Sequence, residues 1–384
     1  MGREFLIYVY LHVFRFFFTL FKLFPLQKNK TTFIASFGQN VWFTLQQLGN
    51  SPEQKCVILQ TARCTESLHG YPCKKVIPFK AKHPFNWFRA IYHLATSRIV
   101  FVDNYYGILA ASAFRKNVYC IQLWHAAGAI KRFGLKDQAI KDRSQRTYRR
   151  FVKVYKRMDF VVVGSEKMGS IFCSAFGLDK RHLLRTGIPR TDFFFDQHAQ
   201  REAVENIIAK YPAMQNKKVL LYAPTYRNGP SGKHLKIDLT ALYNAFSQEY
   251  ILFIQTHPTV QWKIDQQYEG FAFEITNTTI NHMLCVTDIL ITDYSSVIFE
   301  YALLKRPIVF FAYDLGEYAE ERGFWEDYTS LVPGPIVENT AELISCIKQY
   351  DYPVSKIEKF AEEWNHYSKG ESSKNLVDLF YPKH

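Results

Sequence analysis

The arrangement of short apolar runs along this chain is the sequence feature that most constrains its fold. In the first half, runs rich in β-branched and aromatic residues alternate with helical stretches, and they cover residues 31–38, 56–61, 98–103, 118–126, 160–165 and 183–189. The same alternation continues in the second half, with runs at residues 217–225, 251–258, 288–296 and 307–314. Continuous apolar runs between helices are typical of parallel strands in a sheet covered on both faces. We therefore predict an α/β fold.

The two series of runs predict two Rossmann-like domains. A chain of 384 residues exceeds the usual size of a single core, at roughly 150 residues per domain. A polar helical stretch around residues 196–216 separates the series, so we place the boundary near residue 195 and the domains at 27–195 and 196–384. Ligands of open α/β sheets bind beyond the carboxyl ends of the strands. Polar residues that follow the runs are therefore the candidates for a site in the cleft.

We expect residues 1–26 to form an amphipathic membrane-associated helix. Residues 5–24 are almost wholly apolar, and their polar members recur at helical spacing in one narrow stripe of His12, Arg15, Thr19 and Lys22. A spanning helix would hold Arg15 near its centre at a cost of about 2.5–3.5 kcal/mol. In the interface, anionic headgroups would instead meet Arg15, Lys22, Lys28 and Lys30. A buried helix of the fold and a signal or spanning segment are the alternatives.

The charge balance indicates an anionic partner. Lys and Arg outnumber Asp and Glu by 48 to 35, which gives a formal net charge of +13 at pH 7. Nucleic acid, anionic lipid and a phosphorylated substrate all fit this charge. The seven cysteines are scattered and form no C-x-x-C pair, so the sequence indicates neither a disulfide framework nor a zinc site and favours a reducing cytoplasm.

Two histidines directly follow strand-like runs. His125 comes after an apolar run and precedes the small residues 126–128, which would leave room for a ligand beside a general base. His257 precedes Pro258, which ends a run and would hold the imidazole at the rim of the sheet. The two could face each other across a cleft, one toward an attacking hydroxyl and one toward phosphate. A purely structural histidine is the alternative at each position.

Other strand ends carry candidate ligands for a phosphorylated donor. A turn at residues 293–296 precedes a helix, whose free N–H groups would bind phosphate together with the hydroxyls of Ser295 and Ser296. The same residues would also serve as an ordinary helix cap. Arg227 could fork onto phosphate oxygens or a carboxylate. A candidate nucleotide-binding turn consists of Gly187, Ile188, Pro189 and Arg190.

A basic run follows His125. Residues 131–157 contain eleven Lys or Arg against two acids. Such a run is often a solvated helix face, but it could also hold the pyrophosphate of a lipid-linked acceptor and contact an anionic bilayer. The residues assigned to the acceptor or membrane by this hypothesis are Arg15, Lys22, Lys131, Arg132, Lys153, Lys156 and Arg157.

Several catalytic classes lack their motifs. The sequence contains no G-x-x-x-x-G-K-[ST], G-x-G-x-x-G, H-E-x-x-H or G-x-S-x-G. The absence of a D-x-D pair disfavours a nucleotide gripped through a carboxylate-bound metal. We expect no cofactor and no metal site, while stimulation by a metal stays open.

Five motifs in order resemble the CDP-glycerol:poly(glycerophosphate) glycerophosphotransferase family, over about residues 30–380. They are WHAAGAIK (124–131), APTYR (223–227), THP (256–258), TDYSSVIFE (292–300) and the RGF, W, EDY and PGP elements of residues 322–335. The resemblance implies a GT-B-like fold and peripheral attachment to the cytoplasmic face of the plasma membrane. It also implies transfer of glycerol phosphate from CDP-glycerol with release of CMP.

The resemblance also implies roles for single residues. His125 would be the base on the acceptor hydroxyl, and His257 would steady the donor phosphates. Cytidine would lie at 187–190, and the rest of the donor pocket would consist of Arg227, Thr292, Ser295, Ser296 and Glu300. Ala126 stands where many members have glycine, which would narrow the pocket.

Within the family the chain resembles the primase type, because it lacks the extra amino-terminal domain of the polymerases. A primase adds the first glycerol phosphate to N-acetylmannosaminyl-N-acetylglucosaminyl diphospho-undecaprenol in teichoic acid synthesis. The expected partners are therefore CDP-glycerol, this acceptor and an anionic membrane surface, without nucleic acid. The alternatives are a polymerase or ribitol-phosphate transferase of the same family, a nucleotide-sugar glycosyltransferase, and a basic membrane- or nucleic-acid-binding module.

Overall fold

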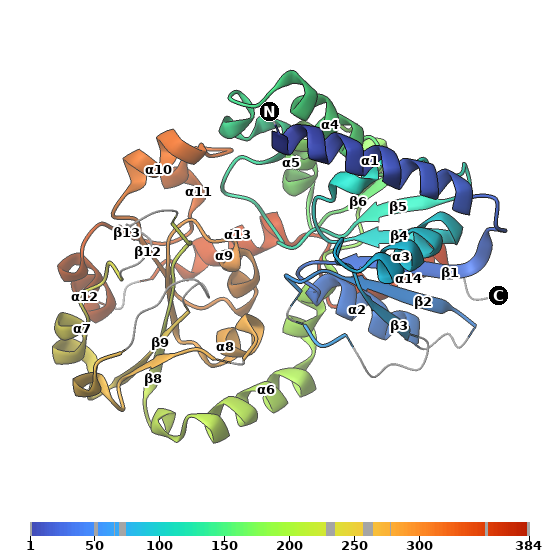
Figure 1. Ribbon diagram of the computed structural model, residues 1–384. Helices are drawn as coiled ribbons and strands as arrows, with labels where there is room; N and C mark the ends of the chain where they lie inside the picture. The colour runs from blue at the N-terminus through green and yellow to red at the C-terminus, as the bar shows by residue number, and fades with distance from the viewer. Residues whose placement is uncertain are drawn as a thin grey trace. The chain divides into compact units, whose positions relative to one another are not determined.

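The computed structural model describes residues 2–49, 53–64, 66–68, 74–227, 235–255, 264–276, 278–349 and 352–381. The chain divides into two compact units, each built on one parallel sheet (Figure 1). The first unit comprises Met1–Ala127, Phe133–Asp192 and His366–His384. The second comprises Gly128–Arg132 and Phe193–Asn365. The two parallel sheets confirm the predicted α/β class.

The sheet of the first unit has seven strands in the order β3-β2-β1-β4-β5-β6-β7, and every neighbouring pair is parallel. Its strands are β1 (Gln27–Ala35), β2 (Lys55–Gln60), β3 (Lys74–Pro78), β4 (Ser97–Val102), β5 (Tyr119–Gln122), β6 (Phe160–Val162) and β7 (Leu183–Leu184). Consecutive residues of β1 from Lys30 to Ala35 are all buried, as expected of a central strand covered on both faces. The helices of this unit are α1 (Gly2–Phe21), α2 (Gln39–Gly49), α3 (Pro84–Thr96), α4 (Gln145–Tyr155), α5 (Glu166–Phe176) and α14 (Ser372–Phe380).

The sheet of the second unit has six parallel strands in the order β10-β9-β8-β11-β12-β13. They are β8 (Lys218–Ala223), β9 (Tyr250–Ile254), β10 (Ala272–Glu274), β11 (Ile289–Thr292), β12 (Ile308–Phe311) and β13 (Ile336–Val337). Apolar side chains of β8, β9, β11 and β12 form its core with residues of α7 and α12. The helices are α6 (Gln197–Lys210), α7 (Leu239–Phe246), α8 (Ile280–Val286), α9 (Val297–Tyr301), α10 (Leu315–Arg322), α11 (Tyr328–Leu331), α12 (Thr340–Gln349) and α13 (Val354–Trp364).

The last residues of the chain return to the first unit. Asp192 accepts hydrogen bonds from the backbone N–H groups of Ser372 and Ser373, both at 2.8 Å, and so caps the amino terminus of α14. The Tyr381 hydroxyl also hydrogen-bonds to Thr31 of β1. The predicted boundary at residue 195 lies close to the observed division at Asp192, but the assignment of all of 196–384 to the second domain is wrong for His366–His384. This segment packs against the first unit through contacts that have no local sequence signal.

Helix α1 belongs to the first unit and keeps most of its apolar surface exposed. Only Phe14 and Phe18 are fully buried, where Phe14 meets Trp87 of α3 and Phe18 meets Phe114. Glu4–Phe21 is long and apolar enough to cross a membrane, by length and composition alone. Lys30, expected at the headgroups, is instead buried on β1, where its ammonium donates to the Thr96 hydroxyl at 2.6 Å.

Candidate active site

The His125 imidazole lies beyond the carboxyl end of β5 and is half-buried. Its Nδ1 lies 3.1 Å from the backbone carbonyl oxygen of Asp103, and its ring stacks on Phe37 with centroids 3.9 Å apart and planes at 9°. A carbonyl oxygen can only accept a hydrogen bond, so the neutral ring carries its proton on Nδ1. The lone pair therefore belongs to Nε2.

Burial lowers the pKa of His125 to about 4, and the nearby Arg190 guanidinium lowers it further, against the hydrogen bond to Asp103, which raises it. The ring is consequently neutral at physiological pH. A neutral imidazole with a fixed tautomer and a lone pair on Nε2 can accept a proton from a hydroxyl group.

Asp103 organises the backbone around this histidine. Its buried carboxylate accepts hydrogen bonds at 2.9–3.0 Å from the N–H groups of Ser36, Phe37 and Gly38, and one at 2.6 Å from the Tyr106 hydroxyl. These N–H groups form the turn after β1, which in many Rossmann-like domains binds a phosphate. Here an internal carboxylate occupies the N–H groups of Ser36, Phe37 and Gly38, so these three are not available to a phosphate. The turn instead places Phe37 against His125. Sequence reasoning missed Asp103, although it directly follows the apolar residues of β4.

The backbone before His125 is strained. Trp124 has a φ of 56°, in the left-handed region that side chains other than glycine rarely adopt. Gln122 accepts a hydrogen bond from the Trp124 N–H at 2.9 Å, and Asn40 donates one to the Trp124 carbonyl at 3.0 Å. These two side chains hold the conformation that turns the chain at His125.

The turn after β11 is only partly available to a ligand. The Thr292 hydroxyl is buried and donates to the Ala223 carbonyl at 2.7 Å, so it links β11 to β8 and cannot serve the predicted donor pocket. Glu300 is buried as well, with 1% of its surface exposed. Ser295 and Ser296 are half-buried and remain candidates. The helix that follows them is α9, with five residues, so the dipole contribution expected from a longer helix is small.

Arg227 is committed to an internal network at the ends of three strands. Its guanidinium pairs with Asp314 at 2.8 and 3.0 Å and with Asp293 at 2.9 Å, and it donates to the Thr225 carbonyl at 2.6 Å. The side chain is 9% exposed, and the rings of Tyr294, Tyr313 and Tyr318 lie within 6 Å of it. The Arg227 guanidinium therefore binds carboxylates of the protein. The prediction that Arg227 contacts a donor phosphate directly is not supported. Asp314 was missed, although it ends the run at 307–314.

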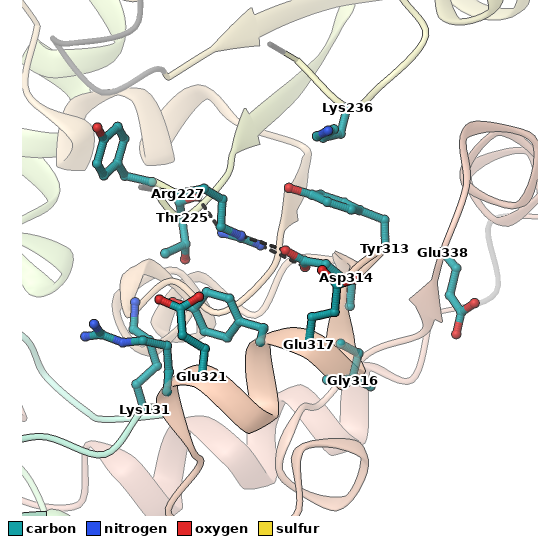
Figure 2. Close-up of a pocket in the computed structure, with 15 residues that line it drawn as sticks. Lys131, Thr225, Arg227, Lys236, Tyr313, Asp314, Gly316, Glu317, Glu321 and Glu338 are labelled. Carbon is teal, nitrogen blue, oxygen red and sulfur yellow. Dashed lines mark hydrogen bonds and ion pairs between the residues drawn. The ribbon is translucent and has the colours of Figure 1, made fainter. Parts of the chain in front are cut away.

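A cavity of about 740 Å³ opens next to this network, within the second unit. Residues after β8 and β12 and along α10 line it, together with Lys131. Figure 2 shows Arg227 extended toward Asp314, with Lys131 and Glu321 on one side of it and Lys236 on the other. The cavity combines tyrosine rings with charged groups of both signs, as a site for a polar ligand requires.

The predicted cytidine turn at residues 187–190 is mostly packed within the protein. Gly187 has a φ of 82°, and a Cβ there would lie 2.4 Å from the Ser372 hydroxyl. Ile188 and Pro189 are buried, so the first three residues of the predicted cytidine turn are packed within the protein; Arg190 alone is half-buried. His257 lies outside the described residues. Among the residues that the structure does describe, no cluster of His, Cys, Asp and Glu could hold a metal ion.

The predicted acceptor or membrane residues fall into two groups. Lys153 and Lys156 are exposed and Arg157 is half-buried, at the end of α4, whose Arg150 pairs with Glu4 of α1 at 3.0 Å. Arg15 donates to the Ala110 carbonyl at 3.3 Å, while Lys22 is half-buried. Arg132 and Lys131 belong to the second unit, and the Arg132 Nε donates to the Phe324 carbonyl at 2.9 Å.

Comparison with known sequences gives one family and several relatives. Residues 16–381 match the family described as CDP-Glycerol:Poly(glycerophosphate) glycerophosphotransferase. The chain is 34% identical to the teichoic acid glycerol-phosphate primase of Bacillus subtilis (strain 168), over 92% of this chain and 91% of that protein. It is also 34% identical to the teichoic acid poly(ribitol-phosphate) polymerase of Bacillus spizizenii, over 97% of this chain but 59% of that protein.

Comparison with solved structures identifies the fold. The wall teichoic acid polymerase TagF superposes with a TM-score of 0.79 at 24% identity, over 97% of this chain and 94% of that one. A TagF structure obtained after a soak with CDPG gives a TM-score of 0.76 at 24% identity, with the same coverage of both chains. The two α/β units therefore have the GT-B-like fold of TagF.

Proposed function

The chain belongs to the CDP-glycerol:poly(glycerophosphate) glycerophosphotransferase family and is an enzyme of that class, and from this premise we propose that it primes wall teichoic acid. In this reaction it transfers glycerol phosphate from CDP-glycerol to N-acetylmannosaminyl-N-acetylglucosaminyl diphospho-undecaprenol and releases CMP. The observation that carries the proposal is His125, a neutral imidazole with its lone pair on Nε2 at the end of a strand.

The chemical step that we propose begins with proton transfer to His125. The acceptor hydroxyl gives its proton to Nε2, and its oxygen attacks the glycerol-bearing phosphorus of CDP-glycerol. The bond between this phosphorus and the bridging oxygen breaks, and CMP leaves with the electron pair. A neutral histidine suits this step, because a protonated one has no lone pair to accept the proton.

Ser295 and Ser296 are the donor-phosphate ligands that we propose, together with His257. Both serines are half-buried at the carboxyl edge of the second sheet, where ligands of such sheets bind. Arg190, half-buried beside the His125 site, is the one residue of the 187–190 turn that we retain as a nucleotide contact. The TagF structure soaked with CDPG supports a CDP-glycerol donor for this fold.

The primase assignment rests on the relatives. The chain matches 91% of the length of the Bacillus subtilis glycerol-phosphate primase, against 59% of the poly(ribitol-phosphate) polymerase. Both relatives are 34% identical to this chain, so identity does not separate glycerol from ribitol phosphate. A polymerase or ribitol-phosphate transferase is therefore the second candidate.

We further propose that the enzyme binds the cytoplasmic face of the plasma membrane through α1 and α4. Large apolar side chains of α1 are exposed, with Phe5, Leu6 and Phe16 between 62% and 69% exposed. The basic helix α4 contacts α1, since the Arg146 guanidinium lies 5.6 Å from the centroid of the Tyr8 ring. Apolar side chains beside a basic helix suit an anionic lipid surface, where a lipid-linked acceptor is found.

To test this function, the purified enzyme is incubated with CDP-glycerol and a short-chain diphospholipid disaccharide. CMP release and the mass of the product are measured. We expect one added glycerol phosphate per acceptor, and a loss of about 10²- to 10⁴-fold in kcat for His125→Ala. A ladder of products would identify a polymerase, and faster turnover of CDP-ribitol would identify a ribitol-phosphate transferase. Turnover of His125→Ala within about threefold of wild type would remove the base assignment.

A further inference from the structure

Lys131 lies in a short segment of the chain that belongs to the second unit. Gly128–Arg132 is assigned to that unit, although the residues on either side of it belong to the first. Lys131 pairs with Phe324 in an antiparallel bridge, flanked by backbone hydrogen bonds from Trp325 N–H to the Ile130 carbonyl at 3.0 Å and from Arg132 N–H to the Gly323 carbonyl at 2.9 Å. A Cβ on Gly128 would lie 2.5 Å from the Phe299 ring. The backbone that carries Lys131 is therefore fixed on both sides.

Among the described residues, the Lys131 ammonium, which lines the cavity, has no ion-pair partner. It lies 5.9 Å from the centroid of the Tyr318 ring and is half-buried. Within the part of the chain that the structure describes, it forms neither an ion pair nor a hydrogen bond. Arg322, a second cation, lines the same cavity. An ammonium group has three donors and no acceptor, so a half-buried one without a protein partner is completed by water or by an anion, and an anion also meets its charge.

The carboxylates around the cavity do not form an ion pair with the Lys131 ammonium among the described residues. Asp314 is engaged by Arg227 and by the Tyr294 hydroxyl at 3.0 Å, and Asp293 by Arg227. Glu317 and Glu321 of α10 and Glu338 are exposed to solvent. The ammonium of Lys131 is thus available to bind an anionic ligand, whereas the guanidinium of Arg227 is already paired with carboxylates of the protein.

Thr225 gives a second, independent sign of a missing acceptor. Its hydroxyl is buried, lines the same cavity and has no hydrogen-bond partner among the described residues. The Thr225 N–H and carbonyl are both satisfied, by Asp293 and Arg227 respectively. An ammonium and a hydroxyl that both lack an acceptor indicate a ligand rich in acceptor oxygens, as a phosphate ester is.

We propose that Lys131 binds a phosphate group of a substrate in this cavity, with the Thr225 hydroxyl as a second donor. The inference rests on the proposed function, which supplies two phosphate-bearing molecules: the CDP-glycerol donor and the diphospholipid acceptor. Lys131 is thereby a substrate-contacting residue of the second unit rather than a residue of the membrane surface.

The titration of Lys131 makes the proposal testable by pH. Burial lowers the pKa of its ammonium to about 8; Asp293 opposes this, while Arg322 and Arg227 add to it. The other ionisable groups that line the cavity are Tyr226, Lys236, Tyr313, Asp314, Glu317, Tyr318, Glu321 and Glu338. Phosphate affinity should therefore fall as the pH rises through about 8, where the ammonium loses its proton. Arginine in its place would keep the charge and remove this pH dependence.

The experiment compares Lys131→Gln and Lys131→Arg with wild type and with Lys348→Gln, an exposed lysine of α12 outside the cavity. KM is measured separately for CDP-glycerol and for the short-chain diphospholipid acceptor, from pH 6.5 to 9. We expect Lys131→Gln to raise one KM at least tenfold, as loss of a charged hydrogen bond does. The KM that rises identifies the molecule bound. Lys131→Arg should restore that KM and flatten its rise above pH 8, and Lys348→Gln should match wild type.

A direct titration with inorganic pyrophosphate separates this inference from the proposed function. Weaker pyrophosphate binding by Lys131→Gln than by wild type, at unchanged thermal stability, supports the cavity site even if the enzyme turns over no CDP-glycerol. Equal binding by the two proteins, together with unchanged KM values, would overturn the inference. Absence of CMP release by wild type, with pyrophosphate binding dependent on Lys131, would overturn the function alone.

Discussion

At the scale of single residues, contacts of His125 limit what its imidazole can do. The Asp103 carbonyl fixes the proton on Nδ1, while Phe37 on one side and Trp124, with its centroid 4.4 Å away, cover the ring. The covering removes water from the charged form and so disfavours it. The same contacts therefore set both the tautomer and the charge of the proposed base.

We expect kcat/KM for CMP release to stay high as the pH falls from 7 to 5 and to decline only near pH 4. The base is active when deprotonated, and burial lowers the pKa of His125 to about 4. The measurement is the pH profile of kcat/KM on CDP-glycerol. Phe37→Ala uncovers the ring and should move the acidic limb toward the ordinary value of about 6.5. A wild-type limb already near 6.5, unmoved in Phe37→Ala, would contradict this account.

The sequence located His125 but could not show what holds it. Its place after an apolar run is visible in the primary structure, whereas the Asp103 carbonyl and the Phe37 ring come from other strand ends. Arg227 was identified as a charged residue at a strand end, yet its partners Asp293 and Asp314 lie 66 and 87 residues away in the chain. Whether an arginine binds a substrate or a carboxylate of the protein depends on such partners, which lie far away in the sequence.

At the scale of elements, the apolar runs predicted every strand that has a neighbouring strand on each side in its sheet. Every predicted run contains a strand, from β1 to β12. The strands without a predicted run are β3, β10 and β13, and each lies at the edge of its sheet. An edge strand has one neighbouring strand, so it needs fewer apolar residues and gives a weaker pattern. The fourth edge strand, β7, does lie within a predicted run, so the pattern at an edge is weakened and not always lost.

Helix α1 is the element whose exposed surface leads to a binding prediction. We expect replacement of Leu6 and Phe16 by serine to weaken binding to phosphatidylglycerol vesicles at least tenfold, since each apolar side chain contributes about 1.5–3 kcal/mol on burial. Cosedimentation measures the bound fraction. The matched control is Ile208→Ser, which removes a side chain of α6 that is 44% exposed, outside α1. Equal losses in the two proteins, or none in either, would argue against α1 as the membrane contact.

At the scale of the whole molecule, the return of the carboxyl-terminal segment makes Gly187 a stability determinant. Gly187→Ala would combine a φ of 82° with a Cβ 2.4 Å from the Ser372 hydroxyl and 2.5 Å from the Tyr367 carbonyl. We expect the free energy of unfolding to fall by about 3 kcal/mol, from backbone strain and overpacking together. Denaturant titration gives this value. Gly107→Ala, where a Cβ meets nothing within 4 Å, serves as the control and should change stability by less than about 1 kcal/mol. A similar small effect at Gly187 would show that the segment is not docked as described.

The docking of α14 also sets an order for folding during synthesis. The ribosome releases the first unit long before His366–His384, yet that unit uses these residues to cap α14 with Asp192 and to reach β1 through Tyr381. The second unit, by contrast, needs only Gly128–Arg132 from earlier in the chain and can complete its sheet first. A nascent chain that has left the ribosome only as far as residue 365 would therefore hold every residue of the second unit while the first unit still lacks its last segment. The half made first would then be the half that chaperones have to protect longest.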